Sequence, residues 1–291
     1  MKQGVLLLAH GAPERVEDVE SYLSFVRGGR PGSPQIVEEV RHRYAAIGGS
    51  SPLLRWTRAQ AEALQALLGI PVFFGMRNWH PFIRETMEQA RGVDRLAAIC
   101  LAPQYSELSV GLYIKRTEEA RRDAGVSAEI AWARSFHDEP LLIQAFAERL
   151  LAQTSAARSA VLFTAHSIPE KALAGGDPYD RETRATAALV AKRAGVADWD
   201  FAYQSQGMTS DRWLGPRVES VLDRYAAAGI REAVLDPIGF VCDHVEILYD
   251  IDIAFRDYAA VRGITLRRPE SLNDSPTFTR ALAEVAKRCL A

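Results

Sequence analysis

Cysteine is scarce in this sequence, and its scarcity excludes whole classes of protein. The 291 residues include three cysteines, Cys100, Cys242 and Cys289, which lie far apart and form no Cys-x-x-Cys pair. An odd and scattered set argues against a disulfide framework and against a thiolate zinc or iron–sulfur site. The pattern fits a protein that works in a reducing cytoplasm.

The chain also lacks a strong net charge and a long apolar run. Its formal net charge is −2, so the bulk charge gives no indication of nucleic-acid binding. The first apolar run is too short for a signal peptide or a membrane span, and no later run reaches spanning length. We therefore expect a cytoplasmic protein without a nucleic-acid partner, whose contact with a membrane is at most peripheral.

What the sequence does contain is a ten-residue pattern that occurs twice. Residues 5–14 read Val-Leu-Leu-Leu-Ala-His-Gly-Ala-Pro-Glu, and residues 161–170 read Val-Leu-Phe-Thr-Ala-His-Ser-Ile-Pro-Glu. Each copy is a short apolar run, typical of a buried strand in a parallel sheet, followed by a histidine and a small turn. Open α/β folds bind ligands outside the carboxyl ends of such strands. The repeat therefore favours His10 and His166 as site residues over a reading as two core histidines.

Strand-like and helix-like segments alternate in both halves of the chain. A clear example is 55–68, where the apolar residues fall on one helical stripe. This alternation predicts an α/β protein with two similar Rossmann-like domains, each a parallel sheet flanked by helices, and a cleft between them. We expect strands at 5–8, 72–74, 96–101, 160–163, 200–203 and 233–235, and helices at 55–68, 81–90, 112–123, 141–153, 181–194, 216–227, 243–258 and 275–290.

The length of the chain suits two domains with cores of their own. We expect an N-terminal α/β domain over residues 1–145 and a C-terminal α/β domain over residues 146–269. A run of small residues at 154–157 is a candidate connection between them. The C-terminal helix, at about 270–291, is expected to pack back on the N-terminal domain.

A second group of chemically active residues follows the last predicted strand. Asp243, His244, Glu246, Asp250 and Asp252 fall within ten residues. Glu246 and Asp250 are four apart, so a helix places them on one face, where their like charges repel unless a cation or a proton intervenes. A solvated acidic helix face is the alternative, but the apolar residues between these side chains argue against it. A histidine and a carboxylate together can hold a divalent metal, accept protons, or do both in turn.

These motifs, with others in the same order, resemble the ferrochelatase family over essentially the whole chain. In the N-terminal half the matching segments are 44–53, 101–106 (Leu-Ala-Pro-Gln-Tyr-Ser) and 113–116 (Tyr-Ile-Lys-Arg). In the C-terminal half they are 165–170, 176–179 (Gly-Asp-Pro-Tyr), 204–207 (Gln-Ser-Gln-Gly), 213–216 (Trp-Leu-Gly-Pro) and 239–250. No single motif is as specific as the set, by which the chain is identified as a class II, homomeric bacterial member.

The resemblance implies insertion of Fe²⁺ into a porphyrin, coproporphyrin III or protoporphyrin IX, late in haem biosynthesis. Two pyrrole protons must leave as the metal enters, and a flat macrocycle does not present its nitrogen lone pairs to the ion. The enzyme must therefore pucker the ring, offer a base and deliver the metal. The family match makes His166 and Glu246 the catalytic pair, and His166, Glu246 and Asp250 the residues that contact the metal.

The resemblance also implies aromatic walls and a cationic rim around the porphyrin. Arginine suits the rim because its guanidinium binds a carboxylate in bidentate fashion; for Arg30, a solvated surface position is an equal alternative. Some bacterial relatives have Tyr where this chain has His10, a candidate axial contact to the metal, and some have His where it has Asn78. The expected substrate-binding residues are His10, Arg27, Arg30, Ser51, Arg77, Asn78, Tyr105, Tyr113, Ser205 and Trp213.

No permanently bound cofactor is implied, because Fe²⁺ is a substrate, and no iron–sulfur cluster is expected. The expected partners are the porphyrin, the haem product, ferrous iron and, transiently, neighbouring haem-pathway enzymes. Two alternatives stay open: a sister tetrapyrrole chelatase that uses cobalt or nickel, and a non-catalytic tetrapyrrole-binding protein. The pairing of His166 with Glu246 argues against the second. Ala254 interrupts the acidic face, so an outer metal relay is incomplete unless Asp252 or Asp257 substitutes.

Overall fold

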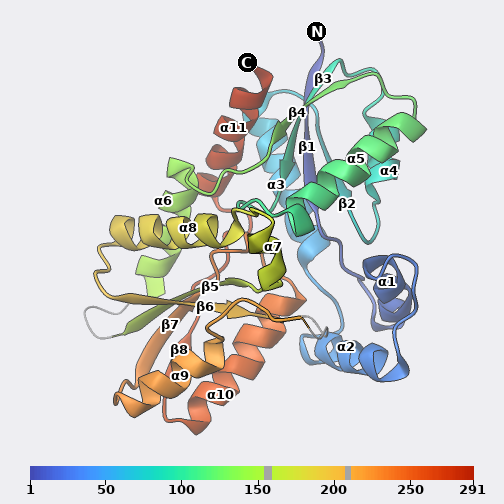
Figure 1. Cartoon of the computed structure of the whole chain (residues 1–291). Coiled ribbons are helices and arrows are strands. Elements are labelled where there is room, and N and C mark those ends of the chain that lie inside the picture. Colours follow the sequence, from blue (N-terminus) through green and yellow to red (C-terminus); the bar gives the residue numbers. More distant parts are fainter. Residues whose placement is uncertain (154–158, 207–210) are drawn as a thin grey trace.

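Two four-stranded parallel sheets, one in each half of the chain, form the frame of the molecule (Figure 1). The computed structural model describes residues 1–153, 159–206 and 211–291. The strand orders are β2-β1-β3-β4 and β6-β5-β7-β8. The predicted α/β class with two similar sheets is confirmed, and the candidate connection at 154–157 lies outside the described residues.

The likeness of the two sheets explains the repeat in the sequence. β1 (Gln3–Ala9) and β5 (Ala160–His166) occupy the same inner position in their sheets. β1 pairs with β2 and β3, and β5 pairs with β6 and β7. His10 directly follows β1 and His166 ends β5, so the two histidines take equivalent places at carboxyl ends. The other strands are β2 (Val72–Met76), β3 (Arg95–Cys100), β4 (Glu129–Ala133), β6 (Trp199–Gln204), β7 (Glu232–Asp236) and β8 (Thr265–Arg267).

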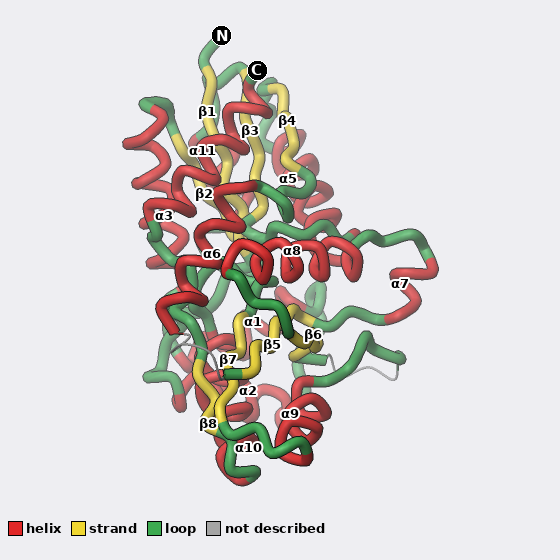
Figure 2. The backbone as a smooth tube through the Cα atoms, turned by 90° about the vertical axis from the view of Figure 1, so that its left-hand side faces the viewer, coloured by secondary structure: helices red, strands yellow, loops and turns green. Residues whose placement is uncertain are grey.

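Helices cover both faces of the first sheet because successive side chains of β1 point to opposite sides. Val5 and Leu7 join the core under α3 and α11, whereas Leu6 and Leu8 join the core under α4 and α5. In Figure 1, α3 and α11 lie on one side of this sheet and α4 and α5 on the other, and Figure 2 looks onto the side covered by α11. The helices are α3 (Leu53–Leu68), α4 (Ile83–Gln89), α5 (Leu112–Asp123), α6 (Pro140–Gln153), α7 (Glu170–Ala174), α8 (Tyr179–Ala194), α9 (Val218–Ala227), α10 (Arg256–Val261) and α11 (Pro276–Leu290).

One apolar core continues from the first sheet to the second. It includes Leu7 and Ile99 of the first sheet, Phe163 and Val234 of the second, and residues of α6 and α11 between them. The C-terminal helix α11 packs against β3, α3 and α6, beside the N-terminus of the chain (Figure 1). Because a well-packed core resists deformation, this continuity fixes the carboxyl ends of the two sheets relative to each other.

Two further helices, α1 (Val19–Val26) and α2 (Pro34–Ala46), lie beside the second half of the molecule (Figure 1). Their apolar faces form a small separate core that also contacts Val245. The loop between them, residues 27–33, carries Arg27 and Arg30, both exposed. Within the described residues, no helix combines the length and apolarity needed to cross a membrane.

The helix predicted at 243–258 has an unusual start. Its first part, η3 (Glu246–Phe255), is a π-helix, in which each N–H bonds to the carbonyl five residues earlier, and α10 continues it. Such wide turns are rare and occur frequently at functional sites. Here the wide turns carry Glu246 and Asp250, two of the predicted site residues.

Candidate active site

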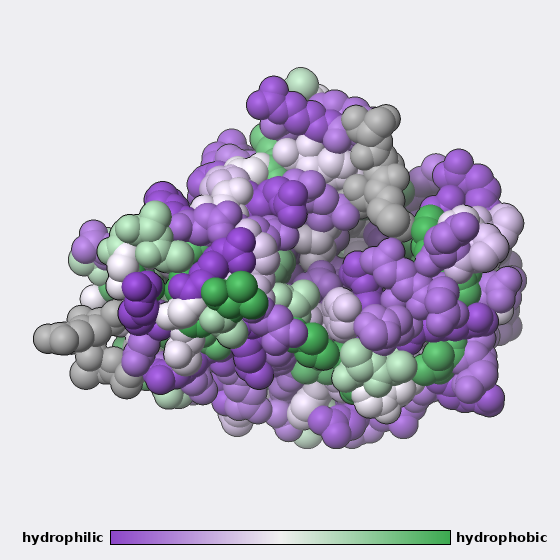
Figure 3. Space-filling model, turned by 90° about the horizontal axis from the view of Figure 1, so that it is seen from below, coloured by the Kyte–Doolittle hydropathy of each residue, from purple (hydrophilic) through white to green (hydrophobic). Residues whose placement is uncertain are grey.

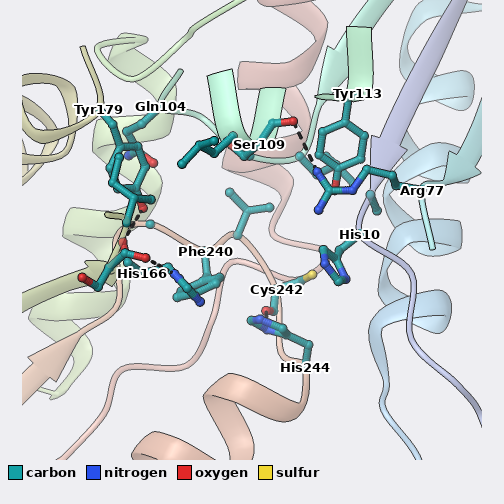
Figure 4. A pocket seen from close by; sticks show the side chains of 18 of the residues that line it. His10, Arg77, Gln104, Ser109, Tyr113, His166, Tyr179, Phe240, Cys242 and His244 are labelled. Carbon is teal, nitrogen blue, oxygen red and sulfur yellow. Dashed lines mark hydrogen bonds between the residues drawn. The ribbon is translucent and has the colours of Figure 1, made fainter. Parts of the chain in front are cut away.

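A cavity of about 360 Å³ lies where the carboxyl ends of the two sheets face each other. Figure 4 shows side chains from both halves pointing into this one space. Its position agrees with the general rule for ligand sites in open α/β sheets, and its mostly apolar lining with a few convergent polar groups is typical of a small-molecule site. The predicted site residues that line it are His10, Arg77, Tyr113, His166 and Trp213.

His166 is held in an orientation that suits a base or a metal ligand. Its Nδ1 lies 2.5 Å from the carbonyl oxygen of Ser167, and the backbone carbonyl of His166 accepts a hydrogen bond from the Tyr179 hydroxyl at 3.0 Å. A carbonyl only accepts, so Nδ1 carries the proton in this hydrogen bond. In the neutral ring, Nε2 therefore keeps its lone pair.

Glu246 faces His166 from the first turn of η3. Its Oε2 lies 3.7 Å from His166 Nε2 and is a buried atom that has no hydrogen-bond partner in the described part of the chain. Burial alone would raise the pKa of Glu246, but the charges of the neighbouring His166, of two further histidines and of Arg43 outweigh it and lower that pKa. The carboxylate is thus ionised near neutral pH with an oxygen unsatisfied, so it can take a cation or a proton. The further histidines are His244 and His10.

His10 has both ring nitrogens engaged. Its Nε2 lies 3.0 Å from the side-chain amide nitrogen of Asn78, and its Nδ1 lies 3.1 Å from the Gly11 carbonyl and 3.2 Å from the Tyr22 hydroxyl. Burial, with the nearby charge of Arg77, lowers the pKa of His10 to about 4, so its ring is neutral. An axial contact between His10 and the metal stays a prediction, and it requires Nε2 to leave Asn78.

Arg77 supplies positive charge to the cavity wall. Its guanidinium carbon lies 4.7 Å from the centre of the Tyr113 ring, and it donates to the Ser109 carbonyl at 3.4 Å. Arg77 and Asn78 also line a second, more open groove of about 430 Å³, bordered by Gly28 and Gly29. Arg27 and Arg30 flank those glycines in the same loop and do not line the cavity itself.

Three other predicted substrate-binding residues use their hydroxyls within the protein. The hydroxyl of Ser51 accepts from the backbone N–H of Leu53 at 3.4 Å, at the start of α3. The Tyr105 hydroxyl donates to Glu107 and the Ser205 hydroxyl donates to Asp250, both at 2.5 Å. Contacts of these three residues with substrate stay predictions. Of the partners of these hydroxyls, Leu53 lines the main cavity, whereas Glu107 and Asp250 do not.

Asp250 lies outside the lining of the main cavity. One carboxylate oxygen accepts from Ser205, and the other lies 3.3 Å from Arg43. Burial raises the pKa of Asp250, the Ser205 hydrogen bond and the Arg43 charge oppose this, and the charge of Glu246 adds to it. A smaller cavity of about 140 Å³ is lined by Glu246, Asp250, Arg43 and Tyr44. Glu246 therefore lines this smaller, outer cavity and lies 3.7 Å from His166, which lines the main one.

Sequence reasoning missed several residues that line the cavity. His244 lies two positions before Glu246, and Phe240 and Cys242 belong to the same family-like segment, 239–250, which was the available signal. Gly239 begins this segment for a steric reason: a Cβ there would lie 2.9 Å from the Cβ of Ala165. A glycine therefore lets the loop pass close over β5. Gln104, Pro169 and Tyr179 also line the cavity and were not among the expected site residues.

No set of three or more metal-ligating side chains is preassembled in the described residues. His166 and Glu246 alone make an incomplete shell of one nitrogen and one carboxylate. Both ligand types suit a divalent first-row metal. An incomplete shell of this kind suits iron as a substrate, which must be released to the porphyrin.

Asp236, at the end of β7, is a buried carboxyl next to the loop that leads to His244. It is 3% exposed, and its Oδ2 has no hydrogen-bond partner among the described residues. Burial raises the pKa of Asp236 to about 8, although the charge of Arg268 acts in the opposite direction. The group is therefore largely neutral at pH 7.

Asp236→Asn is expected to stabilise the protein at alkaline pH. The folded pKa of about 8 exceeds the ordinary 3.8, so the folded state binds more protons between these values and the wild-type free energy of unfolding falls as pH rises through this window. Asparagine does not titrate, so the variant should gain on the wild type by about 3–4 kcal/mol between pH 5 and pH 8. Urea unfolding at both pH values measures this gain, and an equal difference at the two would contradict it.

Comparison with known proteins identifies the family. The family model described as Ferrochelatase matches residues 2–290. The ferrochelatase of Acidobacterium capsulatum is 46% identical over 98% of this chain and 94% of its own length, and the coproporphyrin III ferrochelatase of Halalkalibacterium halodurans is 36% identical over 100% and 98%. The solved structure of SirB from Bacillus subtilis with Fe³⁺ covers 100% of this chain and 96% of its own, with a TM-score of 0.66 and 13% identity, which shows the fold alone. The chain therefore belongs to the ferrochelatase family, the enzymes that insert ferrous iron into a porphyrin in haem synthesis.

Proposed function

We propose that this chain inserts Fe²⁺ into coproporphyrin III, with His166 and Glu246 as the pair that handles protons and metal. The observation that carries the proposal is the approach of His166 Nε2 to the unpartnered Glu246 Oε2, 3.7 Å apart beside the cavity. One atom offers a lone pair, and the other offers a negative charge that no protein donor satisfies. Both properties are needed by a site that removes protons and passes on a cation.

In the proposed mechanism, the macrocycle enters the main cavity between the two sheets. Tyr113 and Trp213 line that cavity from opposite halves, and their rings supply flat apolar surface for the porphyrin. His166 accepts a pyrrole proton at Nε2, and the Glu246 carboxylate accepts the other as Fe²⁺ takes the four nitrogens. The strain that puckers the ring is supplied by contacts around its edge.

Asp250 is the proposed outer partner of Glu246 in moving metal or protons. Its carboxylate shares the small outer cavity with Glu246 and is buried. Fe²⁺ is proposed to be a substrate, with no resident cofactor and no iron–sulfur cluster. The sequence argument for this is that the three cysteines lie far apart and form no Cys-x-x-Cys pair.

The preference for coproporphyrin III rests on charge at the edge of the site. Coproporphyrin III carries four propionates and protoporphyrin IX carries two, so the first needs more cations. Arg77 lines both the cavity and the adjoining groove, and Arg27 and Arg30 lie in the loop beside that groove. Relatives named coproporphyrin III ferrochelatase, 34–36% identical to this chain, support the same choice.

Anaerobic steady-state rates with the two porphyrins test the substrate proposal. We expect kcat/KM for coproporphyrin III to exceed that for protoporphyrin IX by at least about tenfold, as one lost charge-assisted contact is worth roughly 1.5–3 kcal/mol. Equal or reversed values would remove coproporphyrin III as the preferred substrate. Parallel assays with Co²⁺ and Ni²⁺ test the sister-chelatase alternative, for which iron would be the poorer metal.

Arg77→Ala is expected to raise the KM for coproporphyrin III by about tenfold and to change kcat much less, because a propionate contact is similar in the ground and transition states. Arg27→Ala should raise KM less, since Arg27 is exposed. The matched control is Arg58→Ala, because Arg58 is an exposed arginine on α3 that lines neither the cavity nor the groove. An ester-capped porphyrin should be insensitive to loss of Arg77, and equal losses for ester and free acid would show that the contact is not ionic.

We further propose a cytoplasmic enzyme that meets membranes or neighbouring haem-pathway enzymes only transiently. Seen from below, the described surface is largely hydrophilic, and its hydrophobic residues form small separate patches (Figure 3). Phe25 and Leu108 are exposed and border the groove and the cavity, so they are the points at which such contact would occur. Co-sedimentation with anionic liposomes should capture only a minor fraction of the protein.

A further inference from the structure

A buried arginine holds two carboxylates that lie on either side of Glu246 in the sequence. Arg268, just after β8, is largely buried, and its Nε and Nη2 donate to the two oxygens of Asp252 at 2.8 and 2.7 Å. Its Nη1 lies 3.1 Å from Oδ1 of Asp243. One guanidinium therefore ties the loop before η3 to the second turn of η3. Bidentate pairs of this kind combine strength with a fixed geometry.

The Asp243 end of this network continues into the first half of the molecule. Asp243 accepts hydrogen bonds from the side chains of Ser271 at 2.8 Å and Asn273 at 2.9 Å, and its own N–H donates to the Asn273 side chain at 2.9 Å. The Asn273 carbonyl accepts from Gln60 of α3 at 2.8 Å. Asn273 has φ of 45°, a left-handed conformation that asparagine adopts more readily than most residues. The network thus anchors the start of η3 to a helix of the first sheet.

Of the site residues between the anchored points, Asp250 is held by Ser205 and Arg43, whereas His244 and Glu246 have no strong hydrogen bonds of their own. Among the described residues, the His244 ring has one hydrogen-bond contact, from Nδ1 to the Cys242 carbonyl at 3.2 Å, and Glu246 Oε2 has none. The positions of both side chains must therefore be set by the backbone that carries them. Arg268, Asp243 and Asp252 line none of the three cavities described above, so they do not touch the substrate there.

We propose that Arg268 is a positioning residue for iron insertion: by binding Asp243 and Asp252 together, it keeps Glu246 aimed at His166. This inference rests on the proposed role of the His166–Glu246 pair. It also accounts for Asp252, whose two oxygens are both taken by Arg268. Asp252 therefore does not replace the missing carboxylate at Ala254 in an outer metal relay.

Arg268→Lys tests the proposal, because lysine keeps the charge but cannot bind two carboxylates through a fixed fork. We expect kcat to fall by about 10- to 100-fold, the range seen when groups that orient a catalytic side chain are removed, with the porphyrin KM changed less than about threefold. Circular dichroism of the variant is measured alongside, so that the loss of kcat is read on folded enzyme.

Arg262→Lys is the matched control. Arg262, directly after α10, also pairs with a carboxylate, that of Asp223 on α9, and its guanidinium carbon lies 3.4 Å from the centre of the Tyr258 ring. Its loss should change stability but leave kcat and the porphyrin KM unchanged. An Arg268→Lys enzyme with kcat within twofold of the wild type, or one whose KM rises as much as its kcat falls, would overturn the proposal.

If Arg268→Lys fails to fold, Asp252→Asn gives the same test from the other partner. This change releases one end of the network and leaves no unpaired charge on η3. We expect kcat to fall by about 3- to 30-fold with the KM retained, because one of the two anchors is lost. An unchanged kcat in this variant would also overturn the proposal. The wild-type enzyme is assayed first with both porphyrins, so a failure of the substrate assignment shows before either variant is made.

Discussion

His166→Ala should lower the rate of iron insertion by at least about 1,000-fold, within the range expected for loss of a positioned base, while porphyrin affinity stays within a few-fold of the wild type. The reason is geometric: the lone pair of Nε2 is beside the cavity and Nδ1 is committed to the Ser167 carbonyl. Alanine removes the base but leaves the aromatic walls. Anaerobic turnover measures the first quantity, and quenching of protein fluorescence by the porphyrin measures the second.

His42→Ala is the matched control for this variant, since His42 is an exposed histidine on α2. It should retain wild-type turnover. Near-normal turnover in His166→Ala would remove His166 from the mechanism. Loss of porphyrin binding together with turnover would instead give His166 a role in holding the ring.

Glu246→Gln should also lower turnover by about 1,000-fold or more, because the amide keeps the size of the side chain but is neither a base nor an anion. The Glu246 carboxylate is ionised among positive charges, so its neutral replacement removes the group that neutralises an arriving cation. The porphyrin KM should stay within a few-fold of the wild type. A variant that keeps a tenth or more of wild-type turnover would contradict the role of Glu246.

Asp250→Asn provides the graded comparison. Its oxygens are already bound by Ser205 and Arg43, so we expect a smaller effect, about 3- to 10-fold, mainly on the dependence of rate on iron concentration. Iron titrations of the Glu246 and Asp250 variants separate the two roles. An unchanged iron dependence in Asp250→Asn would remove Asp250 from the path and leave the His166–Glu246 pair alone.

The central part of the fold could be predicted from the sequence because its signals are local. The runs that form β1 and β5 are apolar throughout, and the histidine after each run falls at a carboxyl end whatever the details of packing. Two of the four edge strands, β4 and β8, give no such signal. β4 is half-exposed along most of its length and β8 has three residues, so neither has a continuous apolar run. α1 and α2 were missed because they bury few residues, and these pack mainly on each other.

The site could be predicted only in part because several hydroxyls pair with residues far away in the chain. Ser205 donates to Asp250, 45 positions later, and no spacing rule in the sequence indicates that pairing. The apolar pattern of the sequence also does not indicate that η3 is a π-helix, although the wider turns of a π-helix change which side chains share a face. His244 was noted in the sequence as a chemically active residue but was not assigned to the site, because only the fold places its ring beside Phe240 in the cavity wall.

The central claim, that the His166–Glu246 pair removes pyrrole protons as iron enters, is tested most directly by an anaerobic single-turnover experiment. Enzyme loaded with coproporphyrin III is mixed with Fe²⁺ in weak buffer, and the haem spectrum and the release of protons to a dye are followed together. We expect the wild type to release two protons for each haem formed, and His166→Ala and Glu246→Gln to show neither signal on that timescale. Equal rates of metallation in the wild type and in both variants would contradict the account.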